Sequence, residues 1–366
     1  MTAFGLYIHV PFCARKCPYC DFYSRTAVDS TKDFYVDAMC ETMKLAPLNK
    51  VYCADTVYLG GGTPSQLGTA RLVKLLAAVR ERFSVTDGAE ITLECNPSDV
   101  PALDLPALRR VGYNRVSLGL QSAIDSERAA LGRRGSAADV QNALDALRSA
   151  AFGNISLDIM LGVPGQTMSG LRQTLKFVTH AGVQHISAYM LKIEPGTPFS
   201  KRPPDNLPDD DAQADMYLLA CEYLEERGFA QYEISNFAVP GYESRHNLKY
   251  WRCEEYLGLG PAAHSFLDGR RYGYPHDLDG FRHCIQRPAD DDAGGDFEEY
   301  AMLALRLCEG LREEMAQARF GHGIPQKMRR AAEDLARHGL VIVDTGGIRL
   351  TRQGFLLSNR VICELL

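Results

Sequence analysis

Six apolar segments in the first half of the chain alternate with helical patterns, and this alternation constrains the fold more than any other feature. Between the segments, apolar residues recur at i, i+3 and i+4, which is typical of helices with one buried face. Strands separated by helices predict parallel pairing with right-handed crossovers. We therefore predict an α/β fold built on a partial (β/α)6 barrel, open at one side, rather than a closed barrel of eight strands. The first segment begins near residue 4, and the others lie at residues 55–60, 90–97, 115–122, 155–161 and 185–191.

Helix limits in this region are indicated by polar caps and by apolar spacing. A helix is expected over residues 31–45, with Leu45 on or near its buried face. Ser65 and Ser136 are expected as N-caps of later helices, because a serine hydroxyl can accept a hydrogen bond from a free N–H of the first turn.

The second half of the chain gives weaker patterns. Five prolines predict a loop over residues 192–212, and the acidic residues 209–211 suit the N-terminus of a helix. Residues 232–237 are expected to form one short strand, and the polar stretch 268–297 is interpreted as a linker. The predicted division is a barrel at 1–191, an extension with the linker at 192–297, and a C-terminal module at 298–366.

The C-terminal module is expected to have an α+β fold that resembles a winged helix. Two helical patterns lead to a hairpin at residues 339–350, and a final helix begins near Thr351. This shape raises a DNA-binding alternative. However, residues 298–366 hold 9 Asp/Glu and 10 Lys/Arg, and the whole chain has a net charge of −6, so no basic face is evident. We predict no nucleic-acid partner and expect the module to pack against the barrel or cover a substrate.

Composition favours a cytoplasmic location. No apolar run reaches the roughly 18 residues of a membrane helix, and the N-terminus lacks the pattern of a secretory signal. The chain has 11 cysteines, and outside positions 13–20 they are scattered singly. This pattern favours reduced thiols over a disulfide framework.

Three cysteines follow the first expected strand directly, at Cys13, Cys17 and Cys20. Three thiolates on one tight loop can hold three irons of a [4Fe–4S] cluster and leave the fourth iron open, whereas ordinary electron-transfer clusters take four thiolates. Zinc is an alternative, but structural zinc usually takes four ligands, and the nearby His9 lies on the expected strand. The third alternative is that these cysteines are unconnected thiols.

Polar residues near the ends of later strands predict a ligand site. The glycines at 60–62 with Thr63 follow one strand, and Glu94, Gln121 and Asp158 lie near the ends of three others. In parallel barrels, ligand-binding residues cluster at the carboxyl ends of the strands. A carboxylate among apolar residues costs free energy unless it finds a partner, so these groups are expected to share one polar ligand. The alternatives are a tight glycine turn and separate structural hydrogen bonds.

Together these segments resemble the radical S-adenosylmethionine (SAM) superfamily, in the branch that contains oxygen-independent coproporphyrinogen III oxidase and the heme chaperone HemW. The resemblance covers nearly the whole chain. It is carried by YIHVPFC at 7–13, GGGTP at 60–64, LGLQS at 118–122, LDIMLGVP at 157–164 and HNLKYW at 246–251.

The resemblance implies that the three cysteines ligate a [4Fe–4S] cluster whose open iron takes the amino and carboxylate groups of SAM. In this family an electron from the cluster cleaves SAM and makes a 5′-deoxyadenosyl radical. Arg133 rather than Arg134 follows from counting along from Gln121. The residues implied to line the SAM region are Tyr7, Tyr19, Gly61, Gly62, Thr63, Glu94, Gln121, Arg133 and Asp158.

Two departures separate the chain from the oxidase. The oxidase has a fourth cysteine two residues beyond the third, where this chain has Phe22. The oxidase also has a longer extension before its cluster motif. Both differences argue against decarboxylase activity, while HNLKYW at 246–251 resembles the signature of the heme-chaperone branch.

The residues of this signature suit contact with heme. His246 offers an imidazole, a common axial ligand of heme iron, and Asn247 can orient it by a hydrogen bond. Tyr250 and Trp251 offer flat apolar faces. The alternative is a buried histidine with aromatic neighbours that hold the extension to the barrel. His264, which follows a glycine-rich turn, is a lesser candidate.

The leading prediction is a heme chaperone rather than an enzyme. It would bind heme and a SAM-liganded [4Fe–4S] cluster, and deliver heme to apo-hemoproteins, including respiratory enzymes at the membrane. One alternative is the oxidative decarboxylation of coproporphyrinogen III, and another is radical chemistry on heme itself. The chain is expected to be a monomer or a cluster-dependent homodimer.

Overall fold

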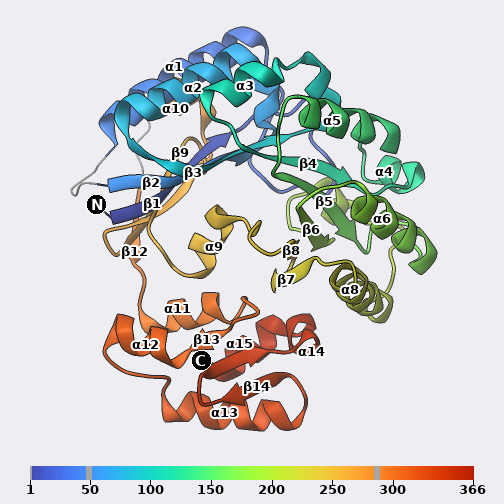
Figure 1. Cartoon of the computed structure of the whole chain (residues 1–366), viewed down its shortest axis with the longest axis vertical. Coiled ribbons are helices and arrows are strands. Elements are labelled where there is room, and N and C mark those ends of the chain that lie inside the picture. The colour runs from blue at the N-terminus through green and yellow to red at the C-terminus, as the bar shows by residue number, and fades with distance from the viewer. Residues whose placement is uncertain (1, 47–51, 284–288) are drawn as a thin grey trace.

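The computed structural model describes residues 2–46, 52–283 and 289–366 of the chain. Within these residues, one twelve-stranded sheet forms the body of the molecule, and a three-stranded sheet belongs to the C-terminal module. Figure 1 shows helices around the outer side of the large sheet and the C-terminal module beyond its open side. Cys284 and part of the expected linker lie outside the described residues.

Six parallel strands form the centre of the large sheet and lie side by side in chain order, which confirms the predicted partial (β/α)6 barrel. Val57 and Leu59 are buried, whereas Tyr58, on the opposite face of the same strand, lines an internal cavity. The inner face of the barrel therefore carries the side chains that line the cavity. The six strands are β1 (Thr2–Val10), β2 (Tyr52–Gly61), β3 (Ser84–Cys95), β4 (Arg115–Gln121), β5 (Ile155–Leu161) and β6 (His185–Met190).

The helices between these strands cover the outer face of the sheet (Figure 1). In α2, Leu72, Leu75, Leu76 and Val79 are buried, and their i, i+3, i+4 spacing aligns them on the face that meets the sheet. The helices are α1 (Asp29–Leu45), α2 (Thr69–Arg82), α3 (Leu105–Val111), α4 (Asp125–Ala130), α5 (Ala137–Ser149) and α6 (Met168–His180), with 3-10 turns η1 (Pro64–Leu67) and η2 (Pro97–Ala102).

Two of the expected helix details are wrong. Ser136 does cap α5, since its hydroxyl accepts from the backbone N–H of Asp139 at 3.3 Å. Ser65, in contrast, lies inside η1 and donates its hydroxyl to Asp99 at 2.6 Å, so α2 starts after Gly68 instead. Leu45 is 79% exposed because it is the last residue of α1, at the end of the packed region.

Short strands extend the central sheet at both edges. The expected single strand at 232–237 is wrong, because a turn at Ile234 and Ser235 divides this segment into an antiparallel pair beside β6. The expected linker at 268–297 is also wrong in its described part, which contains two edge strands and a helix. Charged residues are common on edge strands, and this conceals the pattern. The edge elements are β7 (Ala230–Glu233), β8 (Asn236–Ala238), β9 (Tyr256–Leu259), β10 (His264–Leu267), β11 (Arg270–Gly273), α10 (Leu278–Arg282) and β12 (Ala289–Ala293).

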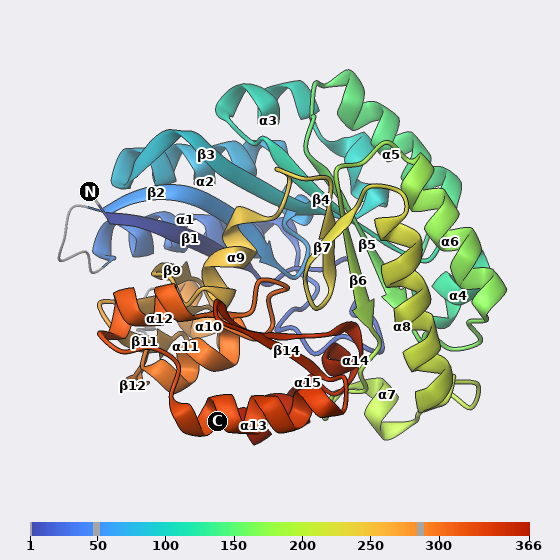
Figure 2. The ribbon, with the colours of Figure 1, turned by 60° about the horizontal axis from the view of Figure 1, so that its bottom comes forward.

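The helix α9 (Arg245–Trp251) lies on the inner side of the sheet, opposite the outer helices (Figure 2). The predicted acidic helix start is confirmed at α8 (Asp210–Glu225), where Asp209 accepts from the backbone N–H of Ala212 at 2.8 Å. The expected loop at 192–212 contains one helical turn, α7 (Pro198–Lys201). The position of α9 matters for function, because this helix fills part of the open side of the barrel.

The C-terminal module is an α+β unit, as predicted, although it holds more helices than expected. Three helices rather than two precede the hairpin, and the final helix is divided in two. Its elements are α11 (Phe297–Ala304), β13 (Leu311–Arg312), α12 (Glu313–Phe320), α13 (Gln326–Arg337), β14 (Val341–Asp344), β15 (Gly347–Leu350), α14 (Arg352–Leu356) and α15 (Ser358–Leu365).

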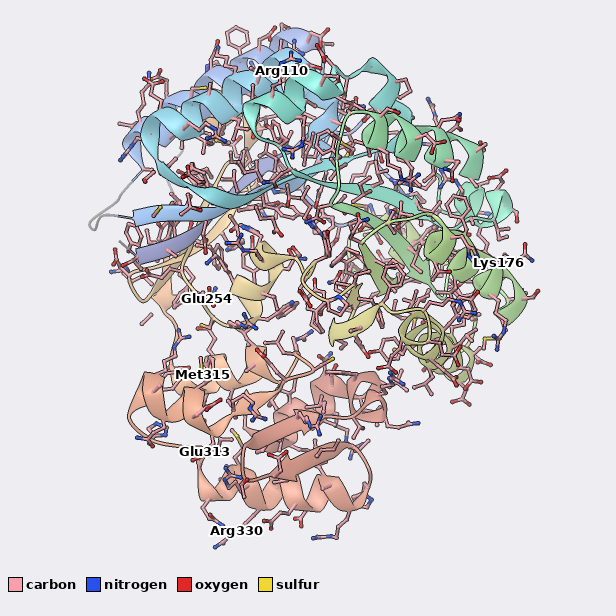
Figure 3. The ribbon with its side chains drawn as sticks, viewed as in Figure 1. Arg110, Lys176, Glu254, Glu313, Met315 and Arg330 are labelled. Carbon is pink, nitrogen blue, oxygen red and sulfur yellow. The ribbon has the colours of Figure 1, made fainter. Side chains whose placement is uncertain are left out.

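The module docks on elements at the open side of the barrel. The guanidinium of Arg319 donates to the carbonyl oxygen of Cys253, just after α9, at 2.7 Å. The backbone N–H of Cys308 donates to the carbonyl oxygen of Tyr232 on β7 at 3.0 Å. Glu254, labelled in Figure 3, lies in the region between the two parts. Among the described helices, none is both long and apolar enough to span a membrane.

Candidate functional site

One cavity of about 490 Å³ occupies the inside of the barrel and opens beside the cysteine loop. All three cysteines line it, together with eight of the nine residues predicted for the SAM region. Tyr7 is the exception. The cavity therefore brings together residues from six separate segments, and the predicted members of its wall are Cys13, Cys17, Tyr19, Cys20, Gly61, Gly62, Thr63, Glu94, Gln121, Arg133 and Asp158.

The glycine loop after β2 fixes the entry to the cysteine loop. The backbone N–H of Gly62 donates to the carbonyl oxygen of Val10 at 2.9 Å, and the backbone N–H of Thr63 donates to the carbonyl oxygen of Phe12 at 2.7 Å. A Cβ atom on Gly62 would lie 2.7 Å from the carbonyl oxygen of Phe12, so only glycine fits there without displacement of the backbone. The two loops are thus held together by main-chain bonds directly before Cys13.

Gly62→Ala is expected to reduce cluster binding sharply. The added methyl group would push away backbone atoms of Phe12, which are not free to rotate aside as a side chain is, and Cys13 would move with them. The measurement is the iron and sulfide content after anaerobic reconstitution. Gly153→Ala is the matched control, because nothing lies within 4 Å of a Cβ atom there. Equal iron content in Gly62→Ala and wild type would contradict this account of the loop.

In the described part of the chain, nothing completes a zinc site around the thiol loop. The three cysteines are free and half-buried at the cavity wall. Within the described residues, no three Cys, His, Asp or Glu side chains already form a metal-binding group, so the loop presents thiols without a preformed cage. His9, the one nearby histidine considered for the zinc alternative, is enclosed, with Nδ1 at 3.0 Å from the Tyr7 hydroxyl and Nε2 at 2.9 Å from the Tyr23 carbonyl oxygen.

Burial makes a thiolate costly at this end of the cavity. Burial raises the pKa of the Cys20 thiol to about 11, and the neighbouring thiols add to this shift. Forming three thiolates side by side therefore needs compensating positive charge, which bound iron would supply. Arg133 lies close by, with Nη1 at 3.9 Å from the sulfur of Cys17 and Nη2 donating to the carbonyl oxygen of Gly119 at 2.8 Å.

Two carboxylates line the cavity, Glu94 from β3 and Asp158 from β5. Burial raises the pKa of Glu94 to about 7, while the Tyr58 hydroxyl donates to Glu94 Oε1 at 2.7 Å. Burial also raises the pKa of Asp158, which accepts from the Ser117 hydroxyl at 3.0 Å. These groups can accept hydrogen bonds from amino or hydroxyl groups of a polar ligand.

Gln121 marks the end of β4 with an unusual backbone. Its φ of 69° is in the left-handed region, which residues other than glycine rarely adopt. Such strain often occurs at binding sites, where the surrounding structure holds a side chain in one orientation. Here it lies on the cavity wall at the position predicted from the strand end.

Two protein-family models match this chain. The Radical SAM superfamily model matches residues 7–178, and the HemN C-terminal domain model matches residues 296–357. The heme chaperone HemW of Bacillus subtilis is 34% identical over 97% of this chain and 97% of its own length. The chain belongs to the HemW family of radical SAM proteins.

A further relative and a solved structure are similar to this chain over its whole length. The mouse mitochondrial protein named radical S-adenosyl methionine domain-containing protein 1 is 37% identical, over 100% of this chain and 88% of its own length. The solved structure of coproporphyrinogen III oxidase (HemN) from Escherichia coli aligns with a TM-score of 0.83, over 100% of this chain and 90% of that one. At 22% identity, this alignment establishes the shared fold alone.

The structure separates the members of the HNLKYW segment on α9. Asn247 lines the cavity. His246 is 1% exposed, and both of its ring nitrogens are engaged, Nδ1 with the Thr56 hydroxyl and Nε2 with the Tyr250 hydroxyl, each at 2.8 Å. Trp251 lies under the Arg306 guanidinium, 5.6 Å from its ring centroid. Heme iron would reach a ring nitrogen of His246 only after one of these two hydrogen bonds breaks.

Two other candidates lie apart from the cavity wall. The Tyr7 hydroxyl is hydrogen-bonded to His9 Nδ1. The ring centroid of Tyr7 lies 6.3 Å from that of His246. Tyr7 therefore supports the strands beneath the cavity. His264 is the first residue of β10, one of the short strands that extend the twelve-stranded sheet.

Several wall residues were missed from the sequence. They include charged and aromatic groups at the mouth and polar groups at the inner end. The signal was available at Arg115 and Ser117, which share one face of β4 with Gln121 by the two-residue period of a strand. The missed residues include Arg15, Lys16, Phe22, Tyr58, Asn96, Arg115, Ser117, Ser187, Tyr189, Lys192 and Glu194.

Proposed function

We propose that this chain binds heme together with a SAM-liganded [4Fe–4S] cluster and passes heme to apo-hemoproteins. The transfer would take place in the cytoplasm, and the acceptors would include respiratory enzymes at the membrane. One observation carries the proposal. Asn247, from the segment typical of the heme-chaperone branch, lines the same cavity as the three cysteines. The names of the near full-length relatives support the same function.

The roles of individual residues follow from their places on the cavity wall. Cys13, Cys17 and Cys20 would hold the cluster, and a reduced cluster supplies the electron for reductive cleavage of SAM. Glu94, near the carboxyl end of β3, and Asp158, in the middle of β5, offer acceptors for the amino and hydroxyl groups of SAM. Phe22, at the cavity mouth, is 63% exposed and offers an apolar face where an oxidase carries its fourth cysteine.

A heme titration tests the proposal directly. The anaerobically reconstituted protein should take up heme in a fixed ratio, and the bound heme should transfer to an apo-hemoprotein supplied in excess. Uptake is followed by the heme absorption band, and transfer by the recovered activity of the acceptor. Failure of the wild type to take up heme would contradict the chaperone proposal.

His246→Ala is expected to lower the stability of the fold more than it alters the coordination of the heme iron. Its removal leaves the buried Thr56 and Tyr250 hydroxyls without their partner, which costs about 1–3 kcal/mol per group. As a positioning residue, His246 holds α9 against β2, so we expect weaker heme binding with an unchanged coordination spectrum. His180→Ala, at the exposed end of α6, is the control. A changed axial-ligand signature in His246→Ala would instead identify this histidine as an iron ligand.

Radical decarboxylation of coproporphyrinogen III is the second candidate. It is favoured by the thiol loop and the SAM-region residues, which share one cavity. Anaerobic incubation with SAM, a reductant and coproporphyrinogen should yield protoporphyrinogen and 5′-deoxyadenosine if this candidate is correct. We expect neither product from this substrate, because the chain has Phe22 at the position of the fourth cysteine.

A further inference from the structure

Arg115 is a buried cation at the inner end of the cavity. It is the first residue of β4, its side chain is 2% exposed, and it lines the cavity wall. Its enclosed Nε has no hydrogen-bond partner, and no ion pair joins its guanidinium to a carboxylate in the part of the chain described. A buried charge without hydrogen bonds is costly, and a guanidinium carries five N–H donors to satisfy.

The nearby carboxylates are already engaged by other donors. Glu90 accepts from the backbone N–H groups of Arg245 at 3.2 Å and His246 at 3.1 Å. Asp158 accepts from the Ser117 hydroxyl. Burial opposes the charge of Arg115, but attraction from Glu90 and other neighbours outweighs it, so the pKa of Arg115 stays above its ordinary value. The guanidinium therefore remains charged, and it lies on the cavity wall without an ion pair to any described residue.

Two further polar groups without partners accompany it. Asn247 lines the same cavity, and no hydrogen bond engages its carboxamide among the described residues. Thr92 pairs in register with Arg115 on the adjacent strand, and its buried hydroxyl oxygen has no partner. A guanidinium fork with a neighbouring amide donor matches a planar oxyanion, above all a carboxylate.

We infer that Arg115, assisted by Asn247, forms a carboxylate-binding site at the inner end of the cavity, and that its ligand is a propionate of the bound tetrapyrrole. The inference rests on the proposed function for the identity of the ligand. Arg133 lies at the cysteine end of the cavity, beside Cys17, so the two arginines serve different parts of the cavity. SAM is the other source of a carboxylate, and the experiment separates the two.

The test compares heme, heme dimethyl ester and SAM as probes of the reconstituted protein. Arg115→Met should weaken heme binding by roughly 10- to 100-fold, the effect of losing hydrogen bonds to a charged group. The wild type should bind the ester more weakly than heme by a similar factor, and Arg115→Met should bind both alike. SAM binding should not change. Arg110→Met makes the same chemical change on α3, in the outer helix layer (Figure 3), and should change nothing.

Each other outcome has a definite meaning. Weaker SAM binding with unchanged heme binding supports a carboxylate site at Arg115 but overturns the propionate as its ligand. Unchanged binding of heme and SAM overturns the inference and leaves Arg115 as a charge partner of Glu90. No heme uptake by the wild type, with SAM binding still weakened by Arg115→Met, contradicts the proposed function but not the carboxylate site.

A second variant tests the same inference if Arg115→Met does not fold. Asn247→Ala removes only a partly exposed carboxamide that holds no other element in place. It should weaken the binding of heme more than the binding of the dimethyl ester. The comparison of heme with its ester in the wild type needs no variant. Equal binding of heme and ester by the wild type would overturn the inference.

Discussion

Cys17→Ser is expected to abolish assembly of the iron–sulfur cluster. Cys13, Cys17 and Cys20 are the thiols of one short loop at the cavity wall, and a cluster held by three thiolates has none to spare. A serine hydroxyl is a poor substitute, because it does not lose its proton to bind iron as readily as a thiol does. SAM should then bind weakly or not at all, since its anchoring iron would be missing.

The measurement is iron and sulfide per chain after anaerobic reconstitution, together with the thiolate-to-iron absorption. Cys363→Ser is the control, because Cys363 is exposed on α15. A variant that keeps the full iron content would show that Cys17 is not a ligand. Wild-type protein that takes up one zinc ion in preference to iron would revive the zinc alternative.

The barrel was predictable because each central strand carries one apolar face under a helix layer. Val57 and Leu59 on β2 show this pattern, and the next turn and helix follow within a few residues. The short strands that extend the sheet beyond the six central ones gave no such signal. β11 is four residues long and begins with two arginines, so neither its length nor its composition distinguishes it from a loop.

The cavity wall was predictable where polar residues end a parallel strand, as at Gln121. Arg115 could not be found in this way, because it lies at the start of β4, deep inside the barrel. Its importance depends on which partners reach it, and this is decided by α9, a helix from a distant part of the sequence. The ligand roles of all these residues stay predictions until they are measured.

The orientation of α9 was only partly contained in its sequence. His246 and Tyr250 are four residues apart, so they share one helix face, and their hydrogen bond follows from this spacing. Asn247 and Trp251 share the neighbouring face for the same reason. Which of the two faces meets β2 is set by the Thr56 hydroxyl and by Glu90, contacts that span more than 150 residues.

Glu94→Gln is expected to flatten the pH dependence of stability between about pH 4.5 and 7. Burial raises the pKa of Glu94 from 4.5 to about 7, so the folded chain holds this proton more tightly than the unfolded chain. Its stabilising contribution is fully present below pH 4.5 and is lost as the pH rises through the folded pKa. The lost contribution is about 3 kcal/mol.

Glutamine cannot ionise, so the free energy of unfolding of wild type relative to Glu94→Gln should fall across this window and level off above it. Urea unfolding of the cluster-free protein at a series of pH values measures this difference. Glu233→Gln should act in the same window, because burial raises the pKa of Glu233 to about 7 as well. Glu298→Gln, at an exposed site on α11, is the control. Parallel curves for wild type and Glu94→Gln would show that this carboxyl group ionises normally, and the polar cavity would then be better solvated than its geometry implies.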